Sequence, residues 1–267
     1  MLVDEAEYSR RLSLVSDAID IGILREATRQ ALLLWSITGA YFVAPLSADP
    51  RIGRLLTNIG MPRIWERHYR ARLYKIDPLP SLSLQHAAGF SWPEATDAAE
   101  LSAAERRYLQ IAARFGMARG VGVACYGPHG RSGFYGVAWP FKRKPQRRVV
   151  QAVQMIGQTS FQRYCQLIQP INEVQPLSNR ELEVLSWMRE GKSNTVIAQI
   201  LDISRASVDM YVRRIFAKLE VTDRTGAVLR GYAMGMIVSN DHEKLMAEAR
   251  ARDVGQWLQV TSPEEGD

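Results

Sequence analysis

Three short helices are predicted in close succession over residues 178–219, and their spacing restricts the fold of this part of the chain. Ser178-Asn-Arg-Glu181 is a capping box, in which the serine hydroxyl accepts from a backbone amide and the glutamate reaches back to the cap. Gly191 ends the first helix, because glycine tolerates the positive φ of a helix C-terminus. Ser193 caps the second helix, and only Asp202-Ile203-Ser204 separates it from the third. The pattern therefore predicts two short helices joined by a tight turn.

A tight turn between two helices, the second of them basic on its outer face, is typical of a helix-turn-helix. Val208, Ile215 and Leu219 recur at helical spacing and predict the buried face of the third helix. Its exposed face could then enter a major groove, where arginine bonds guanine edges. The side chains predicted to read bases or the nearby backbone are Arg205, Ser207, Asp209, Met210, Arg213 and Arg214. Those predicted to contact phosphates are Lys192, Ser193, Lys218, Arg224 and Thr225. A three-helix packing module of another purpose is the alternative.

Helical patterns dominate the first part of the chain. Amphipathic helices are predicted over residues 4–19 and 22–35. A further helix begins after Pro62, which suits a first helical turn. It should stop before Asp77-Pro78, because the residue before a proline avoids the helical region.

Extended patterns lie between these helices. Residues 39–45 predict a buried strand, and residues 120–140 predict two strands joined by a glycine-rich turn. The basic run 142–148 leads into an amphipathic helix that extends to about residue 168. Helices that flank short, mostly sequential strands indicate an α+β sandwich with α/β/α layers and a mostly antiparallel sheet.

The domain organisation follows from these patterns. The stretch QPINEVQP holds two prolines and little apolar content, which is typical of a linker. We expect an α+β domain at residues 1–168, a linker at 169–176, an all-α four-helix domain at 177–238 and an acidic extension at 239–267.

Composition limits the class of protein. The net charge of +6 indicates a polyanionic partner, although residues 1–175 carry eight more basic than acidic residues and residues 176–238 only two more. Two cysteines without a CxxC pair indicate a reducing compartment, and four histidines without ligand spacing predict neither a metal site nor a cofactor. The longest apolar stretch is too short and too polar to span a membrane, and no signal-peptide pattern opens the chain. We expect a cytoplasmic protein that makes no membrane contact.

An ordered set of signature residues lies in the helical domain: Leu177, Glu181, Gly191-Lys192-Ser193, Ile197-Ala198, Leu201, Ile203-Ser204, Val208, Lys218-Leu219, Arg224, Ala227 and Gly235. In this order they resemble the DNA-binding domain of LuxR-type transcription regulators. The chain departs from the family at Val196, where a glutamate usually completes a second capping box, and at Tyr211, which is often histidine. The absence of the second capping box at Val196 should cost about 1 kcal/mol of stability at most. The resemblance implies double-stranded DNA as partner and a homodimer in which the helix over residues 225–236 takes part; a role in the core alone is the alternative for this helix. RNA polymerase is a further candidate partner.

A second ordered set lies in the first domain: Trp65, Tyr69, Asp77-Pro78, Phe90-Ser91-Trp92 and Gly120. These residues resemble the acyl-homoserine-lactone-binding domain of quorum-sensing regulators, which implies that residues 1–168 are an autoinducer-binding domain. By resemblance, the Trp65 indole would donate to the lactone carbonyl, and Asp77 would accept the ligand amide N–H. Tyr69 and Trp92 would form the walls of the pocket.

Three departures affect this resemblance. The interval from Tyr69 to Asp77 is one residue shorter than usual. Met61 stands where relatives often have a tyrosine that donates to the acyl carbonyl. Trp139 falls near the position where relatives often have a small hydroxyl residue that donates to the same carbonyl. A buried carbonyl without a donor costs about 1–3 kcal/mol. The replacement donor is expected among Trp139, Tyr41, Tyr74 and Tyr135. A bulky Trp139 would favour a short, branched or aryl acyl group.

The function implied is that of a ligand-responsive bacterial transcription regulator. It would bind an N-acyl-homoserine lactone and, as a dimer, a near-palindromic promoter site. The alternative is a LuxR-type regulator that responds to a non-lactone ligand or acts without ligand. An enzyme that cleaves or modifies such lactones would need a metal cluster or an activated Ser or Cys beside a base, and neither is visible in the sequence.

Overall fold

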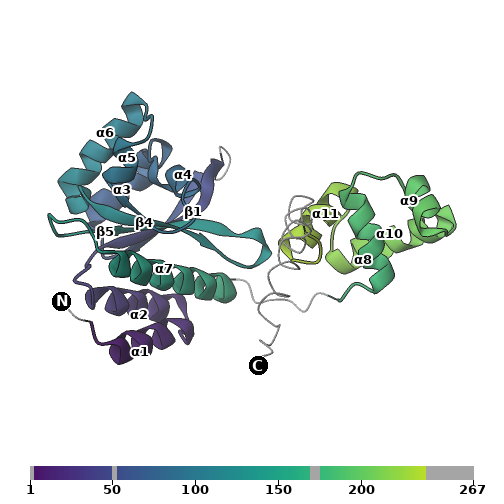
Figure 1. The fold of residues 1–267 in the computed structure, drawn as a ribbon, viewed down its shortest axis with the longest axis horizontal. Helices are drawn as coiled ribbons and strands as arrows, with labels where there is room; N and C mark the ends of the chain where they lie inside the picture. The colour runs from purple at the N-terminus through teal and green to yellow at the C-terminus, as the bar shows by residue number, and fades with distance from the viewer. Residues whose placement is uncertain (1–2, 50–52, 169–174, 239–267) are drawn as a thin grey trace, which may run out of the picture. The chain divides into compact units, whose positions relative to one another are not determined.

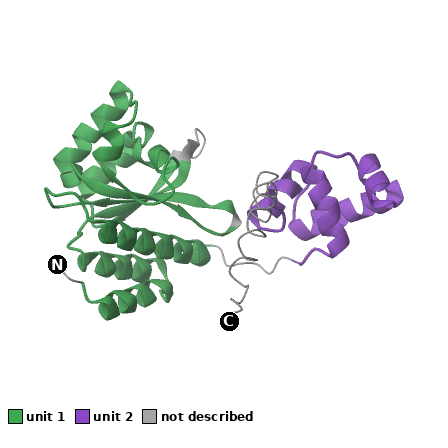
Figure 2. Ribbon diagram, viewed as in Figure 1, with its two compact units in different colours: residues 1–172 green, residues 173–267 purple. Residues whose placement is uncertain are grey.

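The computed structural model describes residues 3–49, 53–168 and 175–238. The chain divides into two compact units, Met1–Asn172 and Glu173–Asp267 (Figure 2). Most of the linker predicted at 169–176 and all of the acidic extension predicted at 239–267 lie outside the described residues. Within the described ranges, no helix is long and apolar enough to cross a bilayer.

Unit 1 is built around one five-stranded sheet. Its strands are β1 (Ala40–Asp49), β2 (Gly53–Ile59), β3 (Phe90–Trp92), β4 (Gly120–Tyr126) and β5 (Ser132–Ala138). They lie in the order β2-β1-β5-β4-β3, and neighbouring strands are antiparallel. Tyr41 of β1, which lies between β2 and β5, is opposite Asn58 of β2 and Gly136 of β5. The predicted hairpin forms β4 and β5, whereas β1 is longer than the predicted strand, and β2 and β3 were not predicted.

Helices cover both faces of this sheet (Figure 1). One face carries α1 (Glu5–Ser16), α2 (Ile21–Leu33) and α7 (Arg147–Ile168). The other carries α3 (Arg63–Ala71), α4 (Leu79–Ser83), α5 (Glu94–Asp97) and α6 (Ala103–Ala112). Each face has its own hydrophobic cluster: one contains Val15 and Ile156, and the other contains Tyr41 and Trp65. The predicted α/β/α sandwich with an antiparallel sheet is confirmed.

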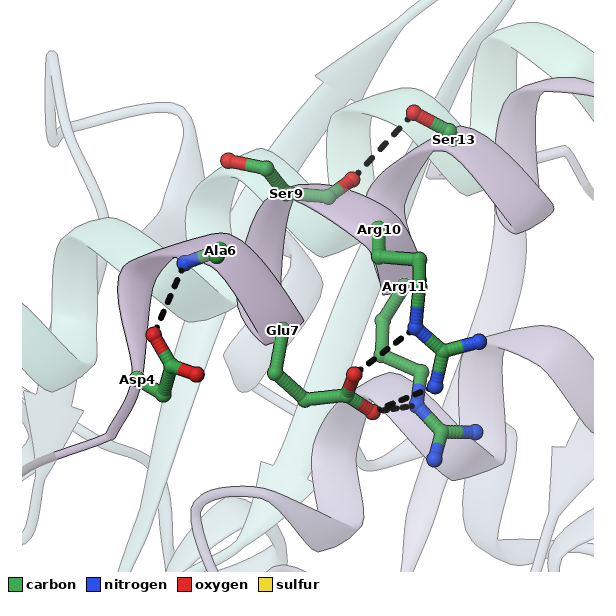
Figure 3. Close-up of polar contacts among 7 residues, drawn as sticks. All are labelled: Asp4, Ala6, Glu7, Ser9, Arg10, Arg11 and Ser13. Carbon is green, nitrogen blue, oxygen red and sulfur yellow. Dashed lines mark hydrogen bonds and ion pairs between the residues drawn. The ribbon is translucent and has the colours of Figure 1, made fainter.

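Helix α1 owes its start and its outer face to short-range polar contacts (Figure 3). The Asp4 carboxylate caps the helix by accepting from the Ala6 amide at 3.1 Å. Glu7 then pairs with Arg10 at 2.7 Å and with Arg11 at 2.6 Å, one turn further along the helix. Exposed pairs of this kind stabilise an isolated helix by about 0.2–0.5 kcal/mol each, so the packing of the apolar face contributes more to the placement of α1.

The chain between α3 and Asp77 is compact. Helix α3 follows Pro62 and, as predicted, ends before Asp77, but it ends already at Ala71. At Arg72 the backbone leaves the helical region with φ −156°, and the 3₁₀ turn η1 (Leu73–Lys75) follows. The Asp77 carboxylate then accepts from the Leu79 amide at 3.0 Å and so stabilises the start of α4.

The described part of unit 2, residues 175–238, contains four helices, α8 (Asn179–Arg189), α9 (Asn194–Leu201), α10 (Arg205–Leu219) and α11 (Arg224–Ala233). The caps predicted at Ser178, Ser193 and Ser204 all accept a backbone N–H, and the capping box at Ser178 is complete. Asp202, in the left-handed region at φ 52°, forms the turn between α9 and α10. The helical domain is therefore confirmed, and its core includes Ile197 and Val208, both 0% exposed.

Gly120 of β4 lies in close contact with Trp92 of the neighbouring strand β3. A Cβ at this position would lie 1.9 Å from the Trp92 ring. We expect Gly120→Ala to lower the free energy of unfolding by about 1–3 kcal/mol, because the ring or the strand must shift to make room. Urea unfolding of the full chain, followed by circular dichroism, measures this; an unchanged midpoint would contradict the close contact.

Candidate functional site

A cluster of buried aromatic rings lies between β1 and α3. Tyr41, Trp65, Tyr69 and Tyr108 are all 0% exposed. The Trp65 ring centroid lies 4.9 Å from that of Tyr41 and 5.0 Å from that of Tyr69, which places the two α3 residues one helical turn apart on the same buried face. Tyr108 comes from α6 and lies edge-on to Tyr69 at 6.4 Å. This arrangement gives the site rigid apolar walls with several polar atoms.

The carboxylate of Asp77 lies at the edge of this cluster. The Tyr69 hydroxyl donates to Asp77 Oδ2 at 2.8 Å, and Asp77 is only 4% exposed. Burial raises the pKa of Asp77 to about 6, although the charge of Arg54, the Leu79 amide and the Tyr69 hydroxyl partly offset this effect. The group is therefore a strong acceptor near neutral pH that takes up a proton under mildly acidic conditions.

Trp65 carries a buried donor that lacks an acceptor. Among the described residues, no hydrogen-bond partner lies within reach of its indole Nε1. A buried polar atom in this state costs about 1–3 kcal/mol, so an acceptor brought next to it recovers that free energy.

Three other predicted pocket residues belong to the larger hydrophobic cluster that contains these four rings. Trp92 and Met61 are buried in that larger cluster, and the half-buried Tyr74 packs against it. The Trp92 indole donates to the Met117 carbonyl at 3.0 Å, which fixes its ring as a wall. The thioether of Met61 has no N–H or O–H, so it cannot replace a tyrosine donor.

Two predicted donors lie on the other face of the sheet. Trp139 and Tyr135 belong to the cluster beneath α1, α2 and α7, and the Trp139 indole donates to the Arg143 carbonyl at 2.7 Å. The structure therefore does not bring either residue together with Trp65.

Sequence reasoning missed two residues that complete the site. The Tyr108 hydroxyl lies 3.5 Å from that of Tyr41, across the site. The Arg54 guanidinium donates to the carbonyls of Tyr74 at 3.1 Å and Asp77 at 3.0 Å, and so braces the segment that carries the carboxylate. The capping box Ser102-Ala-Ala-Glu105 is a sequence signal for α6, but no local pattern points to Tyr108 or Arg54.

In unit 2, the predicted base-reading residues lie on α10. Arg205, Arg213 and Arg214 are exposed, while Ser207 and Met210 are half-buried. Asp209 accepts from the Asn194 side chain at 2.7 Å and lies 4.0 Å from Arg205. The arginines of this helix are therefore available to an acidic partner, whereas Asp209 already joins α10 to α9.

The predicted phosphate contacts fall into two groups, namely exposed side chains and side chains that already bond other residues of unit 2. Lys192, Ser193 and Thr225 are exposed. Arg224 donates to the Asn194 side chain at 3.0 Å and to the Lys192 carbonyl. Lys218 donates to Glu181 at 2.6 Å and to the Pro176 carbonyl at 3.1 Å.

Two family descriptions match this chain. "Autoinducer binding domain" matches residues 23–164, which include the aromatic cluster and Asp77, and "Bacterial regulatory proteins, luxR family" matches residues 175–230, which include α8 to α10. The chain belongs to the LuxR-family regulators. This family consists of transcription regulators rather than enzymes, and its first domain takes a small-molecule ligand.

Named relatives agree with this assignment. A protein of Sinorhizobium fredii named as an HTH-type transcriptional regulator, y4qH, is 30% identical over 67% of this chain and 56% of its own length. The quorum sensing-dependent transcriptional regulator RpaR of Rhodopseudomonas palustris is 26% identical over 74% of this chain and 82% of its own.

A solved structure has the same fold. Escherichia coli SdiA superposes with a TM-score of 0.59 at 20% identity, over 88% of this chain and all of its own. SdiA in complex with octanoyl-rac-glycerol gives a TM-score of 0.60 at 18% identity, over 90% of this chain and all of its own.

The buried ion pair of this LuxR-family DNA-binding domain can be tested directly. Glu181 is 2% exposed; burial alone would raise its pKa, but hydrogen bonds from Lys218 and Ser178 outweigh burial and lower the pKa. We expect Lys218→Met to destabilise unit 2 by about 3 kcal/mol, because it leaves a buried carboxylate unpaired. Urea unfolding at pH 7 measures the loss, and Lys192→Met, at an exposed lysine, serves as the matched control.

Because the pKa of Glu181 is lower in the folded state than in the unfolded state, its ionised form stabilises the fold at a pH above the unfolded pKa. This stabilisation is lost as the pH falls through the folded pKa. The difference between the Lys218→Met variant and the wild type should therefore shrink on acidification. An equal stability of the two proteins at pH 7 would contradict the structural role of Lys218.

Proposed function

We propose that this LuxR-family regulator binds an N-acyl-homoserine lactone in the aromatic cluster of unit 1 and, as a homodimer, a near-palindromic promoter site. The observation that carries the ligand proposal is the buried indole N–H of Trp65, which has no hydrogen-bond partner in the part of the chain that the structure describes. The Trp65 ring contacts that of Tyr69, and Tyr69 bonds the Asp77 carboxylate. One donor and one acceptor thus lie within a single apolar cluster. A lactone carbonyl and an amide N–H are the complementary pair.

Each part of such a ligand has a counterpart in the site. Trp65 would donate to the lactone carbonyl, and Asp77 would accept the amide N–H while retaining the Tyr69 bond. Tyr69 and Trp92 would pack against the apolar parts of the ligand, and each buried methylene of the acyl tail would add about 0.8 kcal/mol. The octanoyl-rac-glycerol bound by SdiA differs from such a lactone, because it has acyl carbonyl and hydroxyl oxygens but no amide.

The donor to the acyl carbonyl is proposed to be a tyrosine. Tyr41 and Tyr108 face each other at 3.5 Å within the cluster, so either hydroxyl can turn to a ligand oxygen. Tyr74 is a further candidate at the edge of the cluster. Trp139 is left out, because its indole already donates to Arg143 on the other face of the sheet.

In unit 2 the recognition helix is proposed to be α10. Arg205, Ser207, Met210, Arg213 and Arg214 would face base edges or the nearby backbone, and Lys192, Ser193 and Thr225 would face phosphates. Asp209, Arg224 and Lys218 would then act by holding these helices in place. Leu229 and Tyr232 of α11, 64% and 55% exposed, would form part of the dimer contact. RNA polymerase is a candidate partner at the promoter, and a regulator of chromosomal DNA would act in the cytoplasm.

Lactone affinity is expected to depend on pH through Asp77. Because the ionised carboxylate accepts the amide N–H in a charge-assisted bond and the neutral acid is a weaker acceptor, affinity should fall below the pKa of about 6, by up to roughly tenfold at pH 5 relative to its plateau above pH 7. Isothermal titration calorimetry with N-butanoyl, N-hexanoyl and N-octanoyl homoserine lactones between pH 5 and 7 measures this.

Asp77→Asn is the matched variant, and it should bind weakly with no change over this pH range. The stability of the ligand-free chain should change with pH in the opposite direction to the lactone affinity. The pKa of Asp77 is higher in the folded than in the unfolded chain, so the ionised carboxylate lowers stability above about pH 6. This destabilisation decreases as the pH falls. A wild-type affinity that is flat with pH would contradict the role of the Asp77 carboxylate.

Arg213 distinguishes base contact from phosphate contact. If it reads a base, Arg213→Ala should weaken binding to the operator by about 1–3 kcal/mol and leave binding to random DNA nearly unchanged. Fluorescence anisotropy with both duplexes at fixed salt measures the difference. Arg180→Ala, at an exposed arginine of α8, serves as the control, and an equal loss on both duplexes would make Arg213 a phosphate contact.

A second candidate is a LuxR-family regulator with a non-lactone acyl ligand, and the octanoyl-rac-glycerol in the SdiA structure favours it. Native mass spectrometry of the protein purified from a lactone-producing host distinguishes the two. A co-purified lactone supports the first proposal, and another co-purified acyl compound supports the second.

A further inference from the structure

Arg54 of the edge strand β2 donates to two segments of backbone, one of which carries Asp77. One guanidinium nitrogen, Nη1, donates to the Tyr74 carbonyl at 3.1 Å and to the Asp77 carbonyl at 3.0 Å. The other, Nη2, donates to the Leu46 carbonyl of β1 at 3.2 Å. Because the planar guanidinium group presents its donors in a fixed geometry, it holds the segment of Asp77 in a defined position against the sheet.

The carboxylate of Asp77 is oriented by different donors from its carbonyl. Oδ2 accepts from the Tyr69 hydroxyl at 2.8 Å, and Oδ1 accepts from the Leu79 amide at 3.0 Å. Arg54 bonds the carbonyl of Asp77, so it acts on the carboxylate through the backbone and through its positive charge.

Arg54 provides the buried side of this carboxylate with a charge. The titratable groups that face Asp77 are the hydroxyls of Tyr41 on β1, Tyr69 on α3 and Tyr108 on α6. Burial raises the pKa of each of these tyrosines well above its ordinary value, so they stay neutral. Burial also raises the pKa of Asp77, and the charge of Arg54 is the largest effect that opposes burial there. Lys75 is exposed, so water screens its charge.

The protonation state of a carboxyl group decides which ligand group it can bind. An ionised carboxylate only accepts hydrogen bonds, whereas the neutral acid can also donate one. An amide N–H therefore suits the ionised form. An ester oxygen in the same place has no hydrogen to donate, and it would leave the buried carboxylate facing another acceptor, which a buried site rejects strongly.

We propose that Arg54 makes this site specific for an amide-bearing acyl ligand over the corresponding ester. Its guanidinium group positions the segment of Asp77, and its charge favours the carboxylate in the state that only accepts. This role rests on the proposed lactone site, and it adds that the choice between an amide and an ester ligand depends on a positioning residue of β2.

Two lactones that differ in a single group test the proposal on the full chain. They are N-hexanoyl homoserine lactone and its ester analogue, in which an oxygen replaces the amide N–H. Isothermal titration calorimetry measures both affinities between pH 5 and 7.5. At pH 7.5 the wild type should bind the amide at least about tenfold more tightly than the ester. This preference should decrease as the pH falls through about 6, because neutral Asp77 can donate to the ester.

Two variants separate the charge of Arg54 from its geometry. Arg54→Gln removes the charge and keeps donor groups, so the pH midpoint of the amide preference should rise by about one unit. Arg54→Lys keeps the charge but loses the planar set of donors, so the midpoint should stay while amide affinity at pH 7.5 falls roughly tenfold. Arg107→Gln, at an exposed arginine of α6, is the matched control and should bind as the wild type does. Circular dichroism verifies that each variant is folded.

Several results would overturn the proposed role of Arg54 and leave the lactone site intact. One is an equal affinity of the wild type for amide and ester at pH 7.5. Another is an equal loss of both affinities in the two variants with an unchanged midpoint, which would make Arg54 a purely structural residue. If Arg54→Gln does not fold, a wild-type amide affinity in Arg54→Lys would overturn the role.

The failure of the lactone site itself gives a different result. In that case the wild type would not bind the amide at any pH in this range. That outcome would overturn the lactone proposal, and the role of Arg54 with it.

Discussion

Aromatic rings on the α3 side of the sheet lie directly on the backbone of neighbouring strands, and this close approach requires residues without a side chain. A Cβ at Gly136 would lie 2.7 Å from the Tyr41 ring, just as one at Gly120 would meet the ring of Trp92. Tyr41 in turn contacts Trp65, so the strand backbone sets the depth of the candidate ligand site. Because protein interiors are close-packed, a single added methyl group would displace the rings that form its walls.

Local signals in the sequence predicted much of this structure. The caps at Ser178, Ser193 and Ser204 each involve residues only three positions apart, so a short stretch of sequence contains the whole interaction. The family pattern likewise predicted Trp65, Tyr69 and Asp77, which the fold brings together. Strand β2 was missed, because Arg54, Thr57 and Asn58 interrupt its apolar alternation and its place at the sheet edge leaves Leu55 exposed.

Long-range contacts could not be predicted in this way. Tyr108 approaches Tyr41 across 67 positions of the chain, and Arg54 reaches Asp77 across 23. Such pairs depend on how the sheet and α6 pack, which no local pattern specifies. Trp139 was predicted at the ligand site, but its side chain lies on the other face of the sheet. A position near the end of β5 does not by itself reveal which face a side chain occupies.

Asn194 connects three helices of unit 2 through one amide group. Its nitrogen donates to Asp209 on α10, and its oxygen accepts from Arg224 at the start of α11. Rotation of α10 about its long axis would break the first bond, and displacement of α11 would break the second. The angular setting of Arg213 is thereby coupled to the helix proposed to meet the partner subunit, so a small rearrangement at that contact would be transmitted to the proposed DNA-binding surface of α10 as a twist.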